Sequence, residues 1–232
     1  MKESNGLNYS PENAHDFNKS TAWIEGKSDY ENPSIIYSIC IYNNRWYFGV
    51  LIKNDPKWQE HKNKPFSFSN SINLKIAKTL VSIVTKGDTS VKLLDACCGV
   101  GTILLEACFS GYDIEGCEIN LKACNSSNKN LEHYNYNSYV HYCDIKDLDK
   151  KYDAAIIDLP YNLYSYSNDE ITENIIKSTA KLADRIIIVS ISDIESIINK
   201  YGLKVTDSCN VDKRGKSKFT RKIWVCERVG SN

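Results

Sequence analysis

The feature that most constrains the fold is a regular alternation of strand-like and helix-like segments from residue 72 towards the C-terminus. Short apolar runs rich in β-branched residues, such as "RIIIVSI", alternate with stretches whose apolar residues recur at helical spacing. Such an order predicts a parallel sheet with helices on both faces. The last two strands follow one another across a short basic loop. We therefore predict a Rossmann-like doubly wound α/β sheet, mostly parallel, with an antiparallel C-terminal edge strand.

The same periodicity sets the expected bounds of these segments. Strands are predicted at 91–96, 113–118, 139–143, 152–158, 185–191, 203–211 and 218–227. Helices are predicted at 72–84, 101–109, 120–134, 169–182 and 193–201. Before them, "PSIIYSICIYNNRWYFGVLIKN" is typical of a β-hairpin that turns near Asn43 and Asn44, and "NDPKWQEHKNKPFSFSNS" of a loop. The chain thus divides into an N-terminal extension with a β-hairpin and loop, residues 1–70, and a main domain, residues 71–232.

Composition excludes several classes of function. Lys plus Arg and Asp plus Glu number 29 each, so there is no overall basic field, and any nucleic-acid binding must be local. The polar N-terminus lacks the apolar stretch of a signal peptide, and no apolar run approaches the roughly 20 residues of a membrane span. The nine cysteines contain no CxxC pair, which favours free thiols over a metal site. We expect a cytoplasmic protein without a membrane partner or a bound metal.

The stretch "LLDACCGVGTILLEA", residues 93–107, joins a predicted strand to a predicted helix through a turn with two glycines. Asp95, Gly99 and Gly101 fall at the carboxyl end of the strand, where open α/β sheets bind their ligands. A dinucleotide site needs a third glycine, where this chain has Leu104, and a P-loop needs Gly-Lys-Ser/Thr, which is absent. Asp95 would also repel a pyrophosphate but favour an ammonium group. The residues therefore argue against a phosphate cradle.

A second acid narrows the choice of ligand. Glu118 lies 23 residues after Asp95, at the end of the next predicted strand. An acid in that place can accept hydrogen bonds from both hydroxyls of a ribose. A ligand that carries a ribose and an amino-acid ammonium but no phosphate is S-adenosylmethionine (SAM). An ordinary glycine turn with unrelated acids stays the alternative on these residues alone.

The motif "DLPY", residues 158–161, follows the fourth strand of the predicted sheet and so shares the ligand-binding edge with Asp95. The amine on a base is a poor nucleophile because its lone pair is delocalised into the ring. The Asp158 carboxylate can accept one N–H and a main-chain carbonyl the other, which favours a pyramidal nitrogen. Pro160 fixes φ and removes a competing donor, and Tyr161 offers a flat face to a base. The tetrad resembles the [Asn/Asp/Ser]-Pro-Pro-[Tyr/Phe/Trp] motif of amino-group methyltransferases.

Together the motifs resemble those of class I SAM-dependent methyltransferases, and more narrowly those of the RNA methylase family that includes the tRNA guanine-N2 methyltransferases. The family signature Asp-Pro-x-Cys-Gly-Ser-Gly-Thr-x-x-x-Glu reads here Asp95-Ala-Cys-Cys98-Gly99-Val-Gly101-Thr102-Ile-Leu-Leu-Glu106. Ala96 and Val100 are mild departures. "HKNKPFSFSNSINLKIAKTLVSI" is also similar to the family's segment before the catalytic core. The likeness covers roughly residues 35–228 and makes 71–232 the expected methyltransferase catalytic domain.

The resemblance implies a role for each matching position. The SAM-binding residues that it implies are Asp95, Cys97, Gly99, Gly101, Thr102, Glu118, Ile119, Asp144 and Ile145. Within this set Glu118 would hold the ribose and Asp144 the adenine amino group. The target amine would be held by Asp158, Leu159, Pro160 and Tyr161, with Asn162 among the substrate-binding residues. Leu159 replaces the usual first proline and Asn162 a frequent glycine, so the motif does not fix the target base.

Contacts with RNA are expected outside this core. The run "DKRGKSKFTRK" between the last two strands carries basic side chains that could contact phosphates near the rim of the site, namely Lys213, Arg214, Lys216, Lys218, Arg221 and Lys222. A solvated hairpin tip is the alternative. A second candidate contact, for which a loop charge cluster is the alternative, comprises His61, Lys62 and Lys64. Tyr164 and Tyr166 either flank a base or pack in the ordinary way.

The predicted function is transfer of a methyl group from SAM to an exocyclic amine of a base in RNA, with guanine N2 in tRNA favoured. Larger family members carry an RNA-binding THUMP domain, which is not expected here because the residues before the core read as a hairpin and loops. RNA binding through a partner protein, or through a homodimer, is therefore left open. The alternatives are a DNA adenine-N6 or protein glutamine methyltransferase, and a catalytically idle RNA- or partner-binding module.

Overall fold

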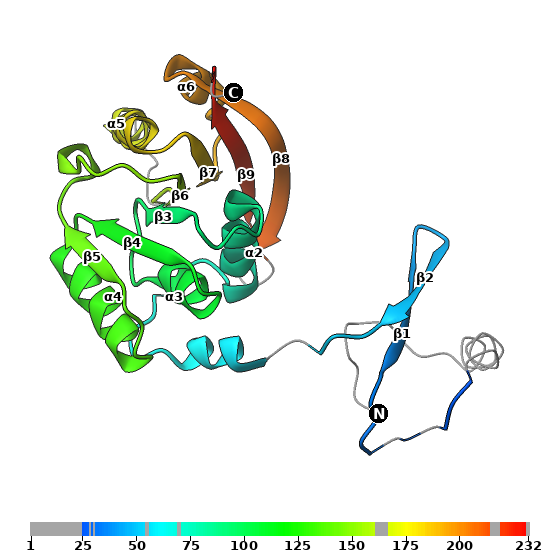
Figure 1. The fold of residues 1–232 in the computed structure, drawn as a ribbon. Coiled ribbons are helices and arrows are strands. Elements are labelled where there is room, and N and C mark those ends of the chain that lie inside the picture. Colours follow the sequence, from blue (N-terminus) through cyan, green and yellow to red (C-terminus); the bar gives the residue numbers. More distant parts are fainter. Residues whose placement is uncertain are drawn as a thin grey trace. The chain divides into compact units, whose positions relative to one another are not determined.

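The computed structural model describes residues 25–27, 29, 31–53, 56–68, 71–160, 167–213 and 219–230. The chain forms two compact units, Met1–Asp55 and Pro56–Asn232 (Figure 1). Residues 56–68, which the sequence analysis assigned to the N-terminal extension, fall in the second unit. There Pro56–Asn63 form the 3₁₀ helix η1 in place of the predicted loop, and Trp58 and His61 are buried.

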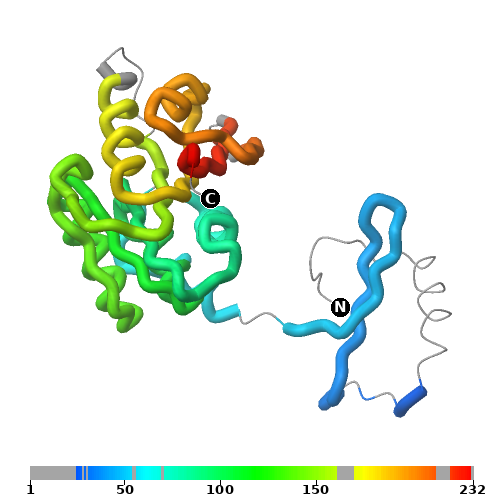
Figure 2. Tube along the Cα trace, turned by 45° about the horizontal axis from the view of Figure 1, so that its top comes forward, coloured from blue at the N-terminus to red at the C-terminus, as the bar shows by residue number. Residues whose placement is uncertain are grey.

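A seven-stranded sheet forms the second unit and confirms the predicted doubly wound fold. Its strands are β3 (Lys92–Asp95), β4 (Asp113–Glu118), β5 (Tyr139–Tyr142), β6 (Ala154–Asp158), β7 (Arg185–Ser190), β8 (Leu203–Lys213) and β9 (Phe219–Arg228). Their order across the sheet is β5-β4-β3-β6-β7-β9-β8. Strands β3 to β7 are parallel, whereas β9 runs antiparallel to β7 and β8. The C-terminal strand thus inserts beside β7, and β8 forms the edge (Figure 2).

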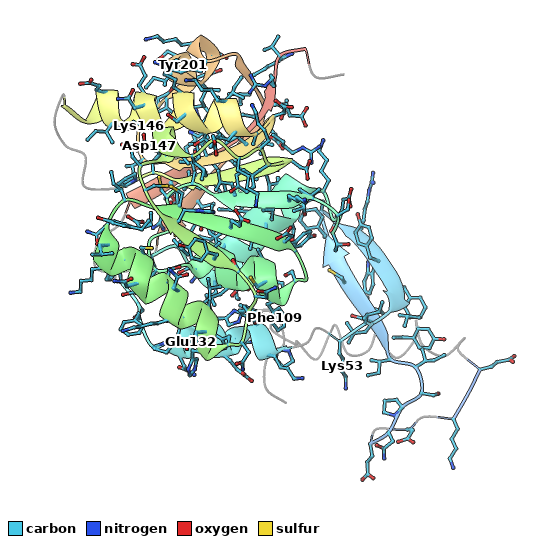
Figure 3. All side chains as sticks on the ribbon, turned by 60° about the vertical axis from the view of Figure 1, so that its left-hand side comes forward. Lys53, Phe109, Glu132, Lys146, Asp147 and Tyr201 are labelled. Atoms are coloured by element: carbon cyan, nitrogen blue, oxygen red, sulfur yellow. The ribbon has the colours of Figure 1, made fainter. Side chains whose placement is uncertain are left out.

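Helices cover both faces of this sheet. They are α2 (Leu74–Thr85), α3 (Thr102–Phe109), α4 (Leu121–His133), α5 (Ser167–Leu182) and α6 (Glu195–Lys200), with the 3₁₀ turn η2 (Ile145–Asp147). Adjacent strand residues point to opposite faces, so Leu93 packs in the core with α2, α3 and α4, and Leu94 in the core with α5 and α6. Figure 3 shows Lys146 and Asp147 of η2 near α5. Burial of both faces explains the near-continuous apolar strands in the sequence.

Local chemistry sets where the helices around the sheet begin. Asn73 accepts a hydrogen bond from the N–H of Lys75 at the start of α2, and Asn120 accepts one from the N–H of Ala123 at the start of α4. Both are N-caps that satisfy an otherwise unpaired helix donor. Helix α3 has no such side-chain cap, and its N-cap residue is Gly101. The glycine turn of the sequence therefore coincides with the start of α3.

The first unit contains the predicted hairpin. Strands β1 (Tyr37–Tyr42) and β2 (Arg45–Val50) pair antiparallel, with Tyr42 opposite Arg45. Asn43 and Asn44 have φ of 48° and 59°, the positive values that a two-residue type I′ turn requires and that asparagine tolerates. Within the part of the chain that the structure describes, no helix combines the length and the apolar composition that crossing a membrane requires.

Candidate active site

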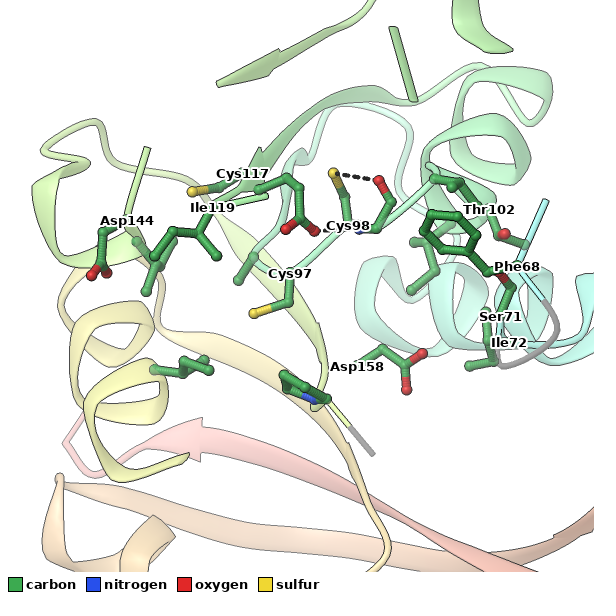
Figure 4. A pocket seen from close by; sticks show the side chains of 18 of the residues that line it. Phe68, Ser71, Ile72, Cys97, Cys98, Thr102, Cys117, Ile119, Asp144 and Asp158 are labelled. Atoms are coloured by element: carbon green, nitrogen blue, oxygen red, sulfur yellow. Dashed lines mark hydrogen bonds between the residues drawn. The ribbon is translucent and has the colours of Figure 1, made fainter. Parts of the chain in front are cut away.

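A cavity of about 840 Å³ opens at the carboxyl ends of β3, β4 and β6 (Figure 4). Its walls also include residues around η2, residues of α5 and the segment before α2. The predicted residues that line it are Cys97, Gly99, Thr102, Glu118, Ile119, Asp144, Ile145, Asp158 and Pro160. Parallel strands end at one edge of a sheet, which is why residues from such distant positions meet. Predicted cofactor and acceptor residues thus share one cavity.

Gly99 keeps the wall of the cavity open at the β3–α3 loop. Its φ of 55° lies in the left-handed region that favours glycine, and no atom lies within 4 Å of the position that a Cβ would take. Its N–H donates to Glu118 Oε2 at 2.9 Å. The loop is therefore joined to the end of β4, and a ligand can approach the main chain closely.

Glu118 is oriented by the main chain on both sides. Oε2 accepts from Gly99, and Oε1 accepts from the N–H of Asn120 at 2.8 Å. A carboxylate offers about four acceptor positions, so both oxygens retain capacity for further donors. The side chain is half-buried and lines the cavity. This arrangement suits a diol such as that of a ribose.

Asp95 lies behind the cavity lining. Its side chain is fully buried, and neither oxygen accepts a well-formed hydrogen bond from the residues that the structure describes. Burial, and then the nearby charges of Asp158 and Glu118, raise the pKa of Asp95 well above its ordinary value. The acids that do line the cavity, Glu118, Asp144 and Asp158, favour a ligand with positive charge. The site therefore fits SAM, which carries a sulfonium, an ammonium and a ribose.

Gly101 shapes the site through packing. It does not line the cavity, although the resemblance placed it among the SAM-binding residues. Its φ is 80°, and a Cβ at this position would lie 2.3 Å from Ser127 Oγ on α4. Because Gly101 has no side chain, the first turn of α3 can pack closely against α4. Thr102, the next residue, is buried and does line the cavity.

Asp144 and its neighbours form the end of the cavity that the resemblance assigns to adenine. Asp144 Oδ1 accepts from the N–H of Lys146 at 3.1 Å, and Lys146 Nζ lies 3.1 Å from Oδ2. Burial raises the pKa of Asp144, but the contacts with Lys146 outweigh it and lower the pKa below its ordinary value. Ile145 is buried, whereas Ile119 is largely exposed along the cavity wall. This end pairs a charged acceptor with apolar surface.

Asp158 ends β6 at the same edge of the sheet and is half-buried in the cavity wall. Leu159 is buried and donates its N–H to the carbonyl of Val189 at 3.1 Å, which continues the pairing of β6 with β7. Pro160 follows, exposed and lining the cavity. The remaining predicted residues of this segment lie outside the described residues, namely Tyr161, Asn162, Tyr164 and Tyr166.

The predicted basic contact between β8 and β9 lies mostly outside the described residues. Arg214, Lys216 and Lys218 lie outside the described residues, and only the main chain of Lys213 is described. Arg221 pairs with Val211 within the sheet, and its side chain is 3% exposed. A buried guanidinium does not fit a contact with surface phosphates. The expectation fails for Arg221 because the basic run continues into β9.

His61 is likewise buried and is not an exposed basic contact. Its Nδ1 lies 2.7 Å from Glu106 Oε1, and its Nε2 lies 2.9 Å from the hydroxyl of Tyr136. The ring packs edge-on against Phe109 and Tyr134. These contacts fasten η1 to α3 and to the chain after α4. The segment that leads into the cavity is thereby held on the second unit.

The residues at one end of the cavity were not among the predicted site residues. Phe68, Ser71 and Ile72 line it there, from the segment just before α2. The similarity of "HKNKPFSFSNS" to the family's segment before the core was a signal for their importance. Asn130, a fully buried residue of α4 that bonds to this segment, had no such signal because buried asparagines follow no sequence period.

Comparison with known proteins agrees with this geometry. Residues 61–190 match the model of the methyltransferase small domain family. The chain is 28% identical to a tRNA (guanine(10)-N2)-dimethyltransferase of Methanothermobacter thermautotrophicus and 27% identical to one of Methanocaldococcus jannaschii. The matches cover 88% and 62% of this chain, and 64% and 45% of the relatives. The chain thus spans less than two thirds of the length of these curated relatives.

Solved structures share the fold. A proposed RNA methyltransferase from Pyrococcus horikoshii superposes with a TM-score of 0.61 at 16% identity, over 76% of this chain and all of the other. TrmN from Thermus thermophilus gives 0.58 at 13% identity, over 87% and 62%. Magnesium protoporphyrin IX methyltransferase from Synechocystis, with bound SAM, gives 0.59 at 16% identity, over 73% and 90%. The fold, the cavity and the family match lead to one conclusion: the chain belongs to the methyltransferase small domain family and is a class I SAM-dependent methyltransferase.

Proposed function

We propose that this protein transfers a methyl group from SAM to an exocyclic amine of a base in RNA, with guanine N2 in tRNA as the favoured target. The observation that carries the proposal is the presence of Asp158 in the same cavity as Gly99 and Glu118. An acceptor for amine hydrogens thus adjoins the residues that suit the cofactor. The names of the two tRNA-modifying relatives support RNA as the substrate class.

The chain's own residues would divide the work along the cavity. SAM supplies an activated methyl group when it is bound. Glu118 would accept the ribose hydroxyls and Asp144 the adenine amino group. A positive charge on the bound ligand would favour the ionised form of the buried Asp95, against the burial and the acids that raise its pKa. The Asp158 carboxylate would accept a hydrogen bond from an N–H of the target amine. This contact would favour a pyramidal nitrogen, whose lone pair is no longer delocalised into the ring. Most of the acceleration would then come from alignment of the two reactants.

Replacement of Glu118 by alanine is expected to weaken SAM binding. The substitution removes the acceptor for the ribose and also the partner of the Gly99 N–H. Each hydrogen bond to a charged group contributes about 1.5–3 kcal/mol, so Kd for SAM should rise about 10- to 100-fold. Isothermal titration calorimetry measures this. Glu132→Ala, on the exposed face of α4, is the matched control and should leave Kd unchanged. An unchanged Kd in Glu118→Ala would remove Glu118 from the cofactor site.

The substrate is tested directly by the identity of the methylated product. Purified protein, SAM with a labelled methyl group and unmodified tRNA transcripts are incubated, and the nucleosides are separated by mass spectrometry. We expect label in N2-methylguanosine. Parallel incubations replace the tRNA with DNA or with protein. Label in N6-methyl-2′-deoxyadenosine of DNA, or on glutamine in protein, with none in tRNA would replace RNA as the substrate. Absence of SAM binding at high concentration in calorimetry would instead favour a catalytically idle module.

A further inference from the structure

The cavity extends past the residues assigned to the cofactor. Asp144 and Ile119 lie at one end, and Phe68, Ser71 and Ile72 lie at the other (Figure 4). The Asp158 side chain points towards the end that holds Phe68 (Figure 4). The group that is proposed to hold the target amine therefore faces a wall made by the segment before α2.

Phe68 is an aromatic side chain that the protein leaves half exposed in this wall. Its exposed fraction is 48%, although it lines the cavity. In the described part of the chain, no other aromatic ring stacks on it. A ring with a free face beside an acceptor for amine hydrogens suits a flat, aromatic amine. Stacking of a base on such a ring contributes about 1–3 kcal/mol.

A buried side chain holds this segment against the glycine loop. Asn130 Oδ1 accepts from the N–H of Phe66 at 3.0 Å, and its Nδ2 donates to the carbonyls of Phe66 at 2.8 Å and Val100 at 2.9 Å. Asn130 is fully buried, so these bonds form away from water, where each is strong. The wall that carries Phe68 and the loop that carries Gly99 are therefore joined through one side chain.

A second buried contact holds the same segment from its other side. His61 lies five residues before Phe66 in the chain. Its side chain forms hydrogen bonds with Glu106 of α3 and with Tyr136. Both Glu106 and His61 are buried, and moving the segment would leave their polar atoms without this hydrogen bond, so the contact resists displacement. Phe68 thus belongs to an anchored wall, and its half exposure reflects the shape of the cavity.

We infer that Phe68 is the stacking wall of the acceptor subsite and selects flat aromatic amines over amides that are not part of a ring. The inference rests on the proposed function, because it assigns the acceptor to the Asp158 end of the same cavity. It distinguishes a base from a glutamine side chain. The glutamine amide offers an N–H to Asp158 but no ring to Phe68.

The test compares substitutions that keep or remove the flat ring. Phe68→Tyr keeps it, whereas Phe68→Leu keeps only apolar bulk. In methyl transfer to tRNA transcripts, kcat/KM should fall about 10- to 100-fold in Phe68→Leu and stay within about 3-fold in Phe68→Tyr. Kd for SAM, measured by calorimetry, should stay within about 2-fold in both, because the ring stacks on the acceptor. Tyr139→Leu, at an exposed aromatic outside the cavity, is the control.

Two results would overturn the inference. One is a Phe68→Leu variant as active as Phe68→Tyr, and the other is a rise in Kd for SAM that matches the fall in kcat/KM. If the wild-type protein methylates no tRNA, the proposed function fails separately. Phe68 is then tested with 2-aminopurine riboside, a fluorescent purine nucleoside, added to the complex with S-adenosylhomocysteine. Emission should fall with wild type and Phe68→Tyr but not with Phe68→Leu, and equal emission from all three would refute the assignment.

Discussion

Replacement of Asp158 by alanine is expected to abolish methyl transfer while SAM binding is retained. Alanine removes the acceptor for the amine hydrogen entirely. Asparagine is the milder change, because its amide oxygen still accepts that hydrogen bond and asparagine also occurs at this position of the amino-group methyltransferase motif. Loss of one preorganised electrostatic contact to the reacting group typically costs about 10²- to 10³-fold. We therefore expect kcat to fall by about 10³-fold in Asp158→Ala and by less in Asp158→Asn.

Two measurements separate this role from a structural one. Single-turnover transfer to tRNA reports the chemical step, and calorimetry reports Kd for SAM. Asp149→Ala, at an exposed position after η2, is the matched control and should behave as wild type. Transfer at the wild-type rate by Asp158→Ala would show that the carboxylate does not hold the amine. A large rise in Kd for SAM would instead place Asp158 in the cofactor site.

The parts of the fold that could be predicted are those that repeat. β3, β6 and β7 each carry apolar residues on both faces, so they appear in the sequence as continuous runs between helical stripes. Parallel strands end at a common edge, and this rule alone brings Glu118 and Asp158 to one cavity. The hairpin could be predicted as well, because adjacent asparagines tolerate the positive φ that its turn requires.

The parts that could not be predicted depend on single contacts between distant residues. His61 meets Glu106 across 45 positions, and Asn130 meets Phe66 across 64. Neither contact follows a sequence period. Glutamate and asparagine are mostly found at the surface, and histidine is intermediate, so nothing in the sequence marks these side chains as buried. The polar run before residue 64 therefore predicted a loop. In the structure it forms η1, which is held in place by the buried side chains of Trp58 and His61.

The burial of Arg221 could not be predicted from the sequence either. The basic run in which it lies suggests a charged loop, but β9 begins at Phe219, so strand geometry decides which side chains reach solvent. Arg221 is buried, whereas Thr220 next to it is exposed. Composition predicts where charge gathers in a sequence, and it cannot predict which face of a strand carries each residue.

Substitution of Gly101 by alanine is expected to be among the most destabilising changes of a single residue in the site. The main chain there has φ of 80°, and the new Cβ would lie 2.3 Å from Ser127 Oγ. Ser127 is fully buried on α4, so it cannot swing into solvent to make room. Backbone strain and overpacking each cost about 1–3 kcal/mol, so the free energy of unfolding should fall by about 3 kcal/mol. Urea denaturation followed by circular dichroism measures this.

Gly99→Ala is the matched control, because it carries the backbone strain without the clash. Its φ is 55°, and no atom lies within 4 Å of the new Cβ, so a loss of only about 1 kcal/mol is expected. A double-mutant cycle isolates the contact itself. Ser127→Ala removes the clashing oxygen and leaves a Cβ 3.4 Å away, an ordinary separation. Gly101→Ala should therefore cost about 1–2 kcal/mol less in a Ser127→Ala background than in the wild type. Equal costs in the two backgrounds would mean that close packing of α3 on α4 does not require this glycine, and that its positive φ alone explains its presence.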